Sequence, residues 1–165
     1  MSQELLLPNP RSSDHYADAL QWLAKVLTSF AQAEQAIGQL TLAMNLPIRN
    51  GSLSSIGEVL SRLESSGERR CQNLTKRIAR WRSLRPLRHL LAHATIRIVY
   101  DDAGEPLIVT RHLPLDESDV TPDRVWTAPE RDELLRIVTN DGRSIVDQVA
   151  NLIQNKPEIG RLRKV

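Results

Sequence analysis

Apolar residues recur along the stretch 14–44 at intervals of three, four and then seven residues. They stand at Leu20, Leu23, Leu27, Phe30, Ile37 and Met44. This spacing predicts one long amphipathic α-helix with a single apolar side. Pro47 marks its end, because proline disrupts a helix interior. Upstream, Pro8 and Pro10 predict an extended arm over residues 1–12, and Ser13 or Asp14 can cap the helix.

One acidic residue interrupts the apolar side of this helix. Glu34 stands where the next core residue after Phe30 is expected. Burying a carboxylate without a partner is unfavourable. Two interpretations remain open. Glu34 lies at the edge of the apolar side and reaches water, or it pairs with an arginine from the basic part of the chain, for which Arg88 is the best candidate.

Two shorter helices are expected next. Ser55 and Glu58 can form a capping box, although the helix could also begin at Ser52. Its buried side would consist of Ile56, Val59, Leu60 and Leu63. A third helix begins near Glu68 and directs three apolar side chains inward, namely Leu74, Ile78 and Trp81.

The period changes after residue 94. Residues 95–100 alternate and are rich in β-branched side chains, residues 101–104 suit a turn, and residues 106–110 return, which predicts a β-hairpin. A hairpin alone is marginally stable, so it must pack on the helices.

Residues 113–127 are expected to form a polar loop. Thr127 and Glu130 offer a capping box for a last helix to about Gln154, with Gly142 as a possible bend. Its inward residues would be Leu134, Leu135, Val138, Ile145, Val149 and Leu152.

The composition is that of one ordinary globular domain. The chain has 165 residues, of which 41% are hydrophobic and 25% are charged. The single cysteine allows no internal disulfide, and we find neither a signal peptide nor a membrane span, so we expect a cytoplasmic protein. We divide the chain into the arm at 1–12, one mainly α domain at 13–155 with the hairpin at about 95–112, and a basic tail at 156–165.

The positive charge is concentrated in one segment. Between Glu68 and Arg88, eight Lys or Arg residues face a single acid, although the net charge of the whole chain is only +2. Such a run is often just a solvated surface, but this excess favours an anionic partner. The candidates for RNA contacts are Arg77, Arg80, Arg82 and Arg85.

The basic segment ends in the stretch WRSLRPLRHLLAHA, residues 81–94. With about 100° per residue, a helix would place Arg88, His89 and His93 away from an apolar side. That apolar side would consist of Leu84, Leu87, Leu91 and Ala94. Because Pro86 does not fit a helix interior, we expect either a kink or a new helix starting near Ser83.

These three side chains suit metal-free cleavage of RNA. A neutral histidine can accept the proton of a ribose 2′-hydroxyl, whose oxygen then attacks the adjacent phosphorus. Arg88 would stabilise the negative charge on the phosphoryl oxygens. His89, or His93 of a second copy, could protonate the leaving oxygen. The spacing of His89 and His93 is also one that metal ligands use, but the sequence offers no clear third ligand, so we expect no metal and no other cofactor.

The segment Arg88-His89-Leu90-Leu91-Ala92-His93 resembles the R-x4-6-H signature of HEPN domains (higher eukaryote and prokaryote nucleotide-binding). In that family the residue after the arginine is commonly Asn, Asp or His, and His89 fits. The order of elements is similar too, with Glu34 on a long first helix and the motif late in a following helix. One toxin subgroup has a tyrosine two residues after the histidine, where this chain has Thr95.

The resemblance implies a helical bundle. The small β-hairpin that the residues predict between the motif helix and the last helix departs from a pure bundle. The resemblance further implies a homodimer with two motifs facing a shared cleft. Many HEPN proteins are metal-independent endoribonucleases of toxin–antitoxin or phage-defence systems. The resemblance therefore implies catalytic roles for Arg88 and His93 with assistance from His89, and we include Glu34 in the expected catalytic set. It also implies RNA as a partner, and an antitoxin or other regulatory protein as a further partner.

Two other functions fit the sequence. The chain could be a non-catalytic HEPN-like module that binds a nucleotide, a nucleic acid or a protein, with Glu34 and Arg88 forming a structural pair. It could also be a helical dimer with no nucleic-acid role, if the acidic segment 115–123 covers the basic helix.

Overall fold

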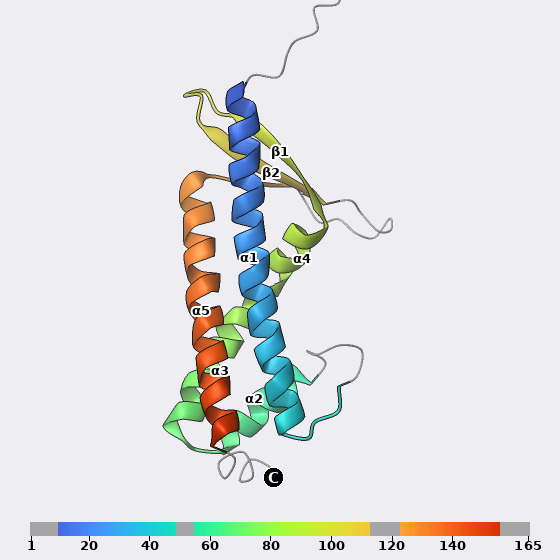
Figure 1. Cartoon of the computed structure of the whole chain (residues 1–165), viewed down its shortest axis with the longest axis vertical. Coiled ribbons are helices and arrows are strands. Elements are labelled where there is room, and N and C mark those ends of the chain that lie inside the picture. Colours follow the sequence, from blue (N-terminus) through green and yellow to red (C-terminus); the bar gives the residue numbers. More distant parts are fainter. Residues whose placement is uncertain (1–9, 49–54, 113–122, 156–165) are drawn as a thin grey trace, which may run out of the picture.

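Two long helices form the spine of the molecule. The computed structural model describes residues 10–48, 55–112 and 123–155. Helix α1 (Pro10–Ala43) and helix α5 (Ala128–Gln154) run side by side in the same direction (Figure 1). The fold is mainly α, with a small antiparallel sheet, as the sequence predicted. None of the described helices combines the length and the apolar character needed to cross a bilayer.

Helix α1 differs from the prediction at both its start and its apolar side. It begins at Pro10, so residues 10–12 are helical rather than part of an extended arm, and residues 1–9 lie outside the described residues. Proline fits a first helical position because the amide there has no helical partner. Leu20 is exposed, and the buried side includes the alanines Ala19 and Ala33, which the pattern did not count. The other buried residues of this side are Trp22, Val26, Phe30, Ile37 and Leu40.

Helices α2 (Ile56–Ser65) and α3 (Arg69–Ser83) cover the C-terminal half of the spine (Figure 1). In α3, the predicted inward residues Leu74, Ile78 and Trp81 are completely buried. The predicted capping box at α2 is wrong. The Ser55 hydroxyl donates a hydrogen bond to the backbone oxygen of Pro47, and Glu58 pairs with Arg62 at 2.9 Å. A tertiary contact has therefore replaced the local cap.

The sheet packs at the other end of the spine. Strands β1 (Ala94–Tyr100) and β2 (Pro106–His112) form the predicted hairpin, in which Ile98 faces Ile108. A third strand, β3 (Arg124–Trp126), pairs with β2, whereas we had expected only a loop there. Trp126 is buried and its ring lies 5.4 Å from that of Trp22, so β3 fastens the sheet to α1.

Helix α5 begins with the predicted capping box. The backbone amide of Glu130 donates to the Thr127 hydroxyl, and the amide of Thr127 donates to the Glu130 carboxylate. The helix continues through Gly142 to Gln154, and Gly142 lies where the helix approaches α1. A Cβ atom at Gly142 would lie 3.0 Å from the backbone oxygen of Ser29. Glycine therefore permits the close approach of α5 to α1.

We predict that Gly142→Ala destabilises the protein, although alanine is intrinsically better in a helix by about 1 kcal/mol. The added methyl group must push the backbones of α1 and α5 apart. Gly57→Ala is the matched control, because a Cβ atom at Gly57 meets no other atom within 4 Å. Urea denaturation should show opposite signs for the two variants. Stabilisation by both substitutions would contradict the close-approach role of Gly142.

Candidate functional site

Helix α4 (Arg85–His93) carries the arginine and the histidines of the motif. It is a new helix with Pro86 in its first turn, the second of the two predicted arrangements. Leu90 and Leu91 are buried against the core, whereas Leu84 and Leu87 are partly buried. Anchoring of this apolar side leaves His89 and His93 on the exposed side of α4.

The imidazole rings of His89 and His93 lie against each other. Their centroids are 4.7 Å apart and the rings are inclined by 53°. This contact follows from their spacing of one helical turn. His93 is the last residue of α4, and β1 begins at the next residue. Two groups able to exchange protons therefore stand together on the surface where α4 meets the sheet.

Arg88 connects α4 to α1. Its Nη2 atom donates a hydrogen bond of 3.3 Å to the Oε2 atom of Glu34. The Arg88 and Glu34 side chains are 35% and 19% exposed, respectively. The predicted pair between Arg88 and Glu34 is confirmed. Glu34 also lies at the edge of the apolar side, whereas its neighbour Ala33 is fully buried. A guanidinium has five N–H donors, so this contact leaves donors of Arg88 for another acceptor.

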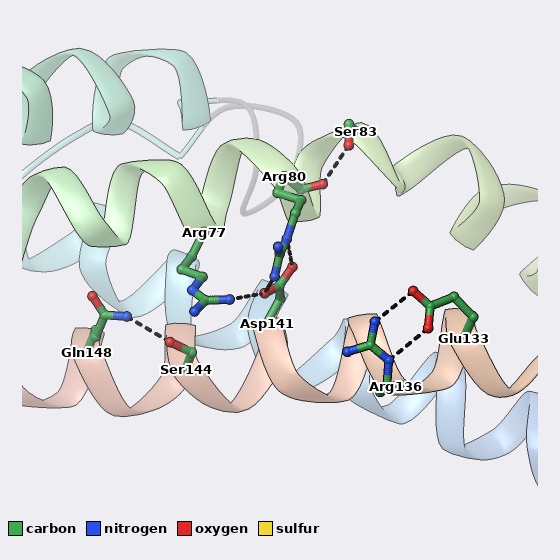
Figure 2. A network of polar contacts seen from close by, with 8 residues as sticks. All are labelled: Arg77, Arg80, Ser83, Glu133, Arg136, Asp141, Ser144 and Gln148. Atoms are coloured by element: carbon green, nitrogen blue, oxygen red, sulfur yellow. Dashed lines mark hydrogen bonds and ion pairs between the residues drawn. The ribbon is translucent and has the colours of Figure 1, made fainter.

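A second carboxylate that binds arginine, and which the sequence prediction missed, lies between α3 and α5. Asp141 is completely buried on α5. Figure 2 shows Arg77 and Arg80 pointing from α3 toward it. Arg77 donates through Nη1 at 2.8 Å, and Arg80 donates through both Nε and Nη2. A signal was present, because Asp141 stands three residues after Val138 and four before Ile145, at a core position of the apolar pattern.

The two arginines keep Asp141 ionised. Burial alone would raise the pKa of this carboxyl group, but the hydrogen bonds from Arg80 and Arg77 outweigh burial and hold its pKa below the ordinary value. In turn, the hydrogen bond to Asp141 raises the pKa of Arg80. The group of three therefore carries a net charge of +1 at neutral pH.

The four arginines predicted to contact RNA do not share one surface. Arg77 and Arg80 face α5, whereas Arg82 follows Arg80 by two residues and so lies about 200° away around α3. Arg85 begins α4 and is exposed, as is Arg82. One pair thus borders α5, and the other lies near the start of the motif helix.

Within the described ranges 10–48, 55–112 and 123–155, no third side chain joins His89 and His93 as a possible metal ligand. No group of three His, Cys, Asp or Glu side chains suited to a metal ion occurs there.

Comparisons of the chain with family models, with curated proteins and with solved structures gave no match.

We predict that Asp141→Asn lowers the free energy of unfolding by about 2 kcal/mol at pH 7, because charged hydrogen bonds are lost. Since the folded pKa of Asp141 is depressed, its stabilisation is present above the unfolded pKa and is lost as the pH falls through the folded pKa. Urea denaturation between pH 7 and acid should show the difference between variant and wild type shrinking. A difference that does not depend on pH would contradict the ionic role.

We also predict that Glu34→Gln lowers the free energy of unfolding by about 1 kcal/mol, since the ion pair with Arg88 is partly shielded from water. Glu133→Gln is the control. It breaks a pair with Arg136 in which both side chains are more than half exposed, at 54% and 62%. Denaturation curves should separate Glu34→Gln from wild type and leave Glu133→Gln close to it. Equal curves for all three proteins would mean that Glu34 does not hold α4.

Proposed function

We propose that the protein is a metal-independent endoribonuclease whose cleavage site is the exposed side of α4. The observation that carries the proposal is the contact between the His89 and His93 rings, at 4.7 Å, beside an arginine that Glu34 holds in place. General acid–base catalysis requires proton donors and acceptors within hydrogen-bond reach of the reacting atoms. Two imidazoles one turn apart suit a proton donor and a proton acceptor for one phosphodiester, which supports the proposal.

The reaction transfers two protons and exchanges one bond at phosphorus. Neutral His93 takes the proton of the 2′-hydroxyl, and the 2′-oxygen forms a bond to the adjacent phosphorus. The bond from phosphorus to the 5′-oxygen breaks, and a protonated His89, or His93 of a second copy, gives its proton to that oxygen. The products are a 2′,3′-cyclic phosphate and a 5′-hydroxyl.

Arg88 has the electrostatic role in this mechanism. The donors that it does not use on Glu34 bind the nonbridging phosphoryl oxygens, whose negative charge increases in the transition state. Glu34 is a positioning residue, because it acts through Arg88. Arg82 and Arg85 contact RNA next to the motif, near the start of α4.

The resemblance of the motif to HEPN domains supports a homodimer in which two copies of α4 face each other. In such a dimer, each copy supplies imidazoles to a common cleft, and RNA binds there. The same resemblance suggests a toxin–antitoxin or phage-defence setting, in which an antitoxin or another regulatory protein would control cleavage.

One observation favours a second candidate function, that of a non-catalytic HEPN-like binding module. The ion pair between Arg88 and Glu34 also fits a purely structural role for the arginine. In that case the motif helix would serve to bind a nucleotide, a nucleic acid or a protein without cleaving it.

We predict that the wild-type protein cleaves mixed single-stranded RNA in excess EDTA and that His93→Ala reduces the rate by about 100-fold or more. The melting temperature should hardly change, because His93 is exposed. His15→Ala is the control, since this imidazole contacts Tyr100 of β1 and lies outside the motif. Gel analysis of the RNA and thermal melts of the three proteins are the measurements.

Folded protein that leaves the RNA intact would favour the binding module. A large loss of stability in His93→Ala would instead make His93 a structural residue. Equal losses of cleavage in His15→Ala and His93→Ala would also contradict the assigned site.

A further inference from the structure

A groove runs between α3 and α5, and none of its lining residues belongs to the motif helix α4. Its first part has a volume of about 530 Å³ and is lined by Asn73, Lys76, Arg77, Arg80, Ser144 and Gln148. A second part of about 370 Å³ is lined by Arg70, Asn73, Gln148, Asn151, Leu152 and Asn155. Asn73 and Gln148 line both parts, so the two parts lie next to each other. We call the whole feature the α3–α5 groove.

The α3–α5 groove is strongly positive. Four of its lining residues are cations, and neither lining includes a carboxylate among the described residues. The acid at this place is Asp141, which is buried and is bound by Arg77 and Arg80. It offsets one of the two charges of Arg77 and Arg80, so this pair keeps a net positive charge beside Lys76.

Asp141 also orients the two guanidinium groups. It accepts one N–H group of Arg77 and two of Arg80, and each guanidinium has five. The two side chains remain 42% and 54% exposed, so their other donors can reach a ligand in the groove. Arginines that are already held in place lose less conformational freedom on binding an anion. Figure 2 shows both side chains between the helices, with Gln148 and Ser144 farther along α5.

The shape of the groove indicates an extended ligand. Its cations on α3 are spread from Arg70 to Arg80, which corresponds to about 15 Å of helix. This length exceeds a single phosphate group. Between and beyond the cations lie side-chain amides that can both donate and accept hydrogen bonds, as the edges of unpaired bases do.

We propose that the α3–α5 groove binds single-stranded RNA, with its cations on the phosphates and its amides toward the bases. The choice of RNA as the polyanion rests on the proposed ribonuclease function. The groove extends that function to a surface apart from the cleavage motif, which holds the strand while α4 acts on another part of it.

The test is the binding of a fluorescently labelled single-stranded RNA of mixed sequence, measured by anisotropy in EDTA. The His93→Ala protein is used so that the RNA stays intact. Lys76→Gln removes one cation of the groove and leaves the contacts of Asp141 in place. Arg143→Gln is the matched control, because it removes one charge from α5 on the side that faces α1.

We expect Lys76→Gln to raise the dissociation constant by about three- to tenfold. The slope of log affinity against log salt should fall in magnitude by about 0.7, which corresponds to one lost phosphate contact on a single strand. Arg143→Gln should change neither quantity. Equal effects of the two substitutions would overturn the proposal, since they would show only a general charge effect. Displacement of the RNA by inorganic phosphate at millimolar concentration would also overturn it, because the site would then hold a single anion.

The two proposals can fail separately. Loss of RNA affinity in Lys76→Gln, together with a wild-type protein that cuts no RNA, would support the groove and contradict the ribonuclease. Cleavage that depends on His93, together with unchanged RNA affinity in Lys76→Gln, would overturn the groove alone.

Discussion

Asp141 joins the most basic helix of the chain to the two-helix spine. It is completely buried on α5, and it accepts hydrogen bonds from two arginines of α3. Glu34 makes a similar connection on the other long helix, where it binds Arg88 of α4. Each basic helix is therefore attached to the spine through a carboxylate that stands at or beside a core position. Since a buried carboxylate is unfavourable alone, each acid also requires its arginine to stay in place.

This arrangement separates two kinds of functional group. Arg77, Arg80 and Arg88 are held by carboxylates, so their positions are defined before any ligand arrives. In contrast, His89 and His93 project from α4 and contact each other at the surface. Fixed guanidiniums suit the binding of phosphate, and exposed imidazoles suit proton transfer. The proposed ribonuclease function and the proposed RNA groove both depend on this division.

Local signals were sufficient to predict much of the fold and part of the site. The capping box at Thr127, the new helix at Pro86 and the pairing of Glu34 with Arg88 follow from short patterns, and the structure has all three. The sequence also placed both histidines on the side of α4 away from the core. The roles of these residues in cleavage stay predictions.

The features that were missed depend on tertiary contacts. Strand β3 has only three residues, so it has no period to detect and exists through pairing with β2. Ser55 bonds to Pro47 instead of capping its own helix. Leu20 is exposed, whereas Ala19 and Trp22 on either side of it are buried against the core. Asp141 stands at a core position of the last helix, but its partners Arg77 and Arg80 come from another helix, so their pairing depends on how α3 packs against α5.

The measurement that tests the cleavage mechanism most directly compares two RNA strands that differ at one position. One strand is unmodified, and the other carries a 2′-deoxy nucleotide at the preferred cleavage position of the wild-type protein. If the 2′-oxygen attacks the phosphorus, the modified strand should stay intact at that position while it binds with similar affinity, and the unmodified strand should end in a 2′,3′-cyclic phosphate. Cleavage of both strands at the same position would contradict the mechanism, because the attacking oxygen would then have to come from water.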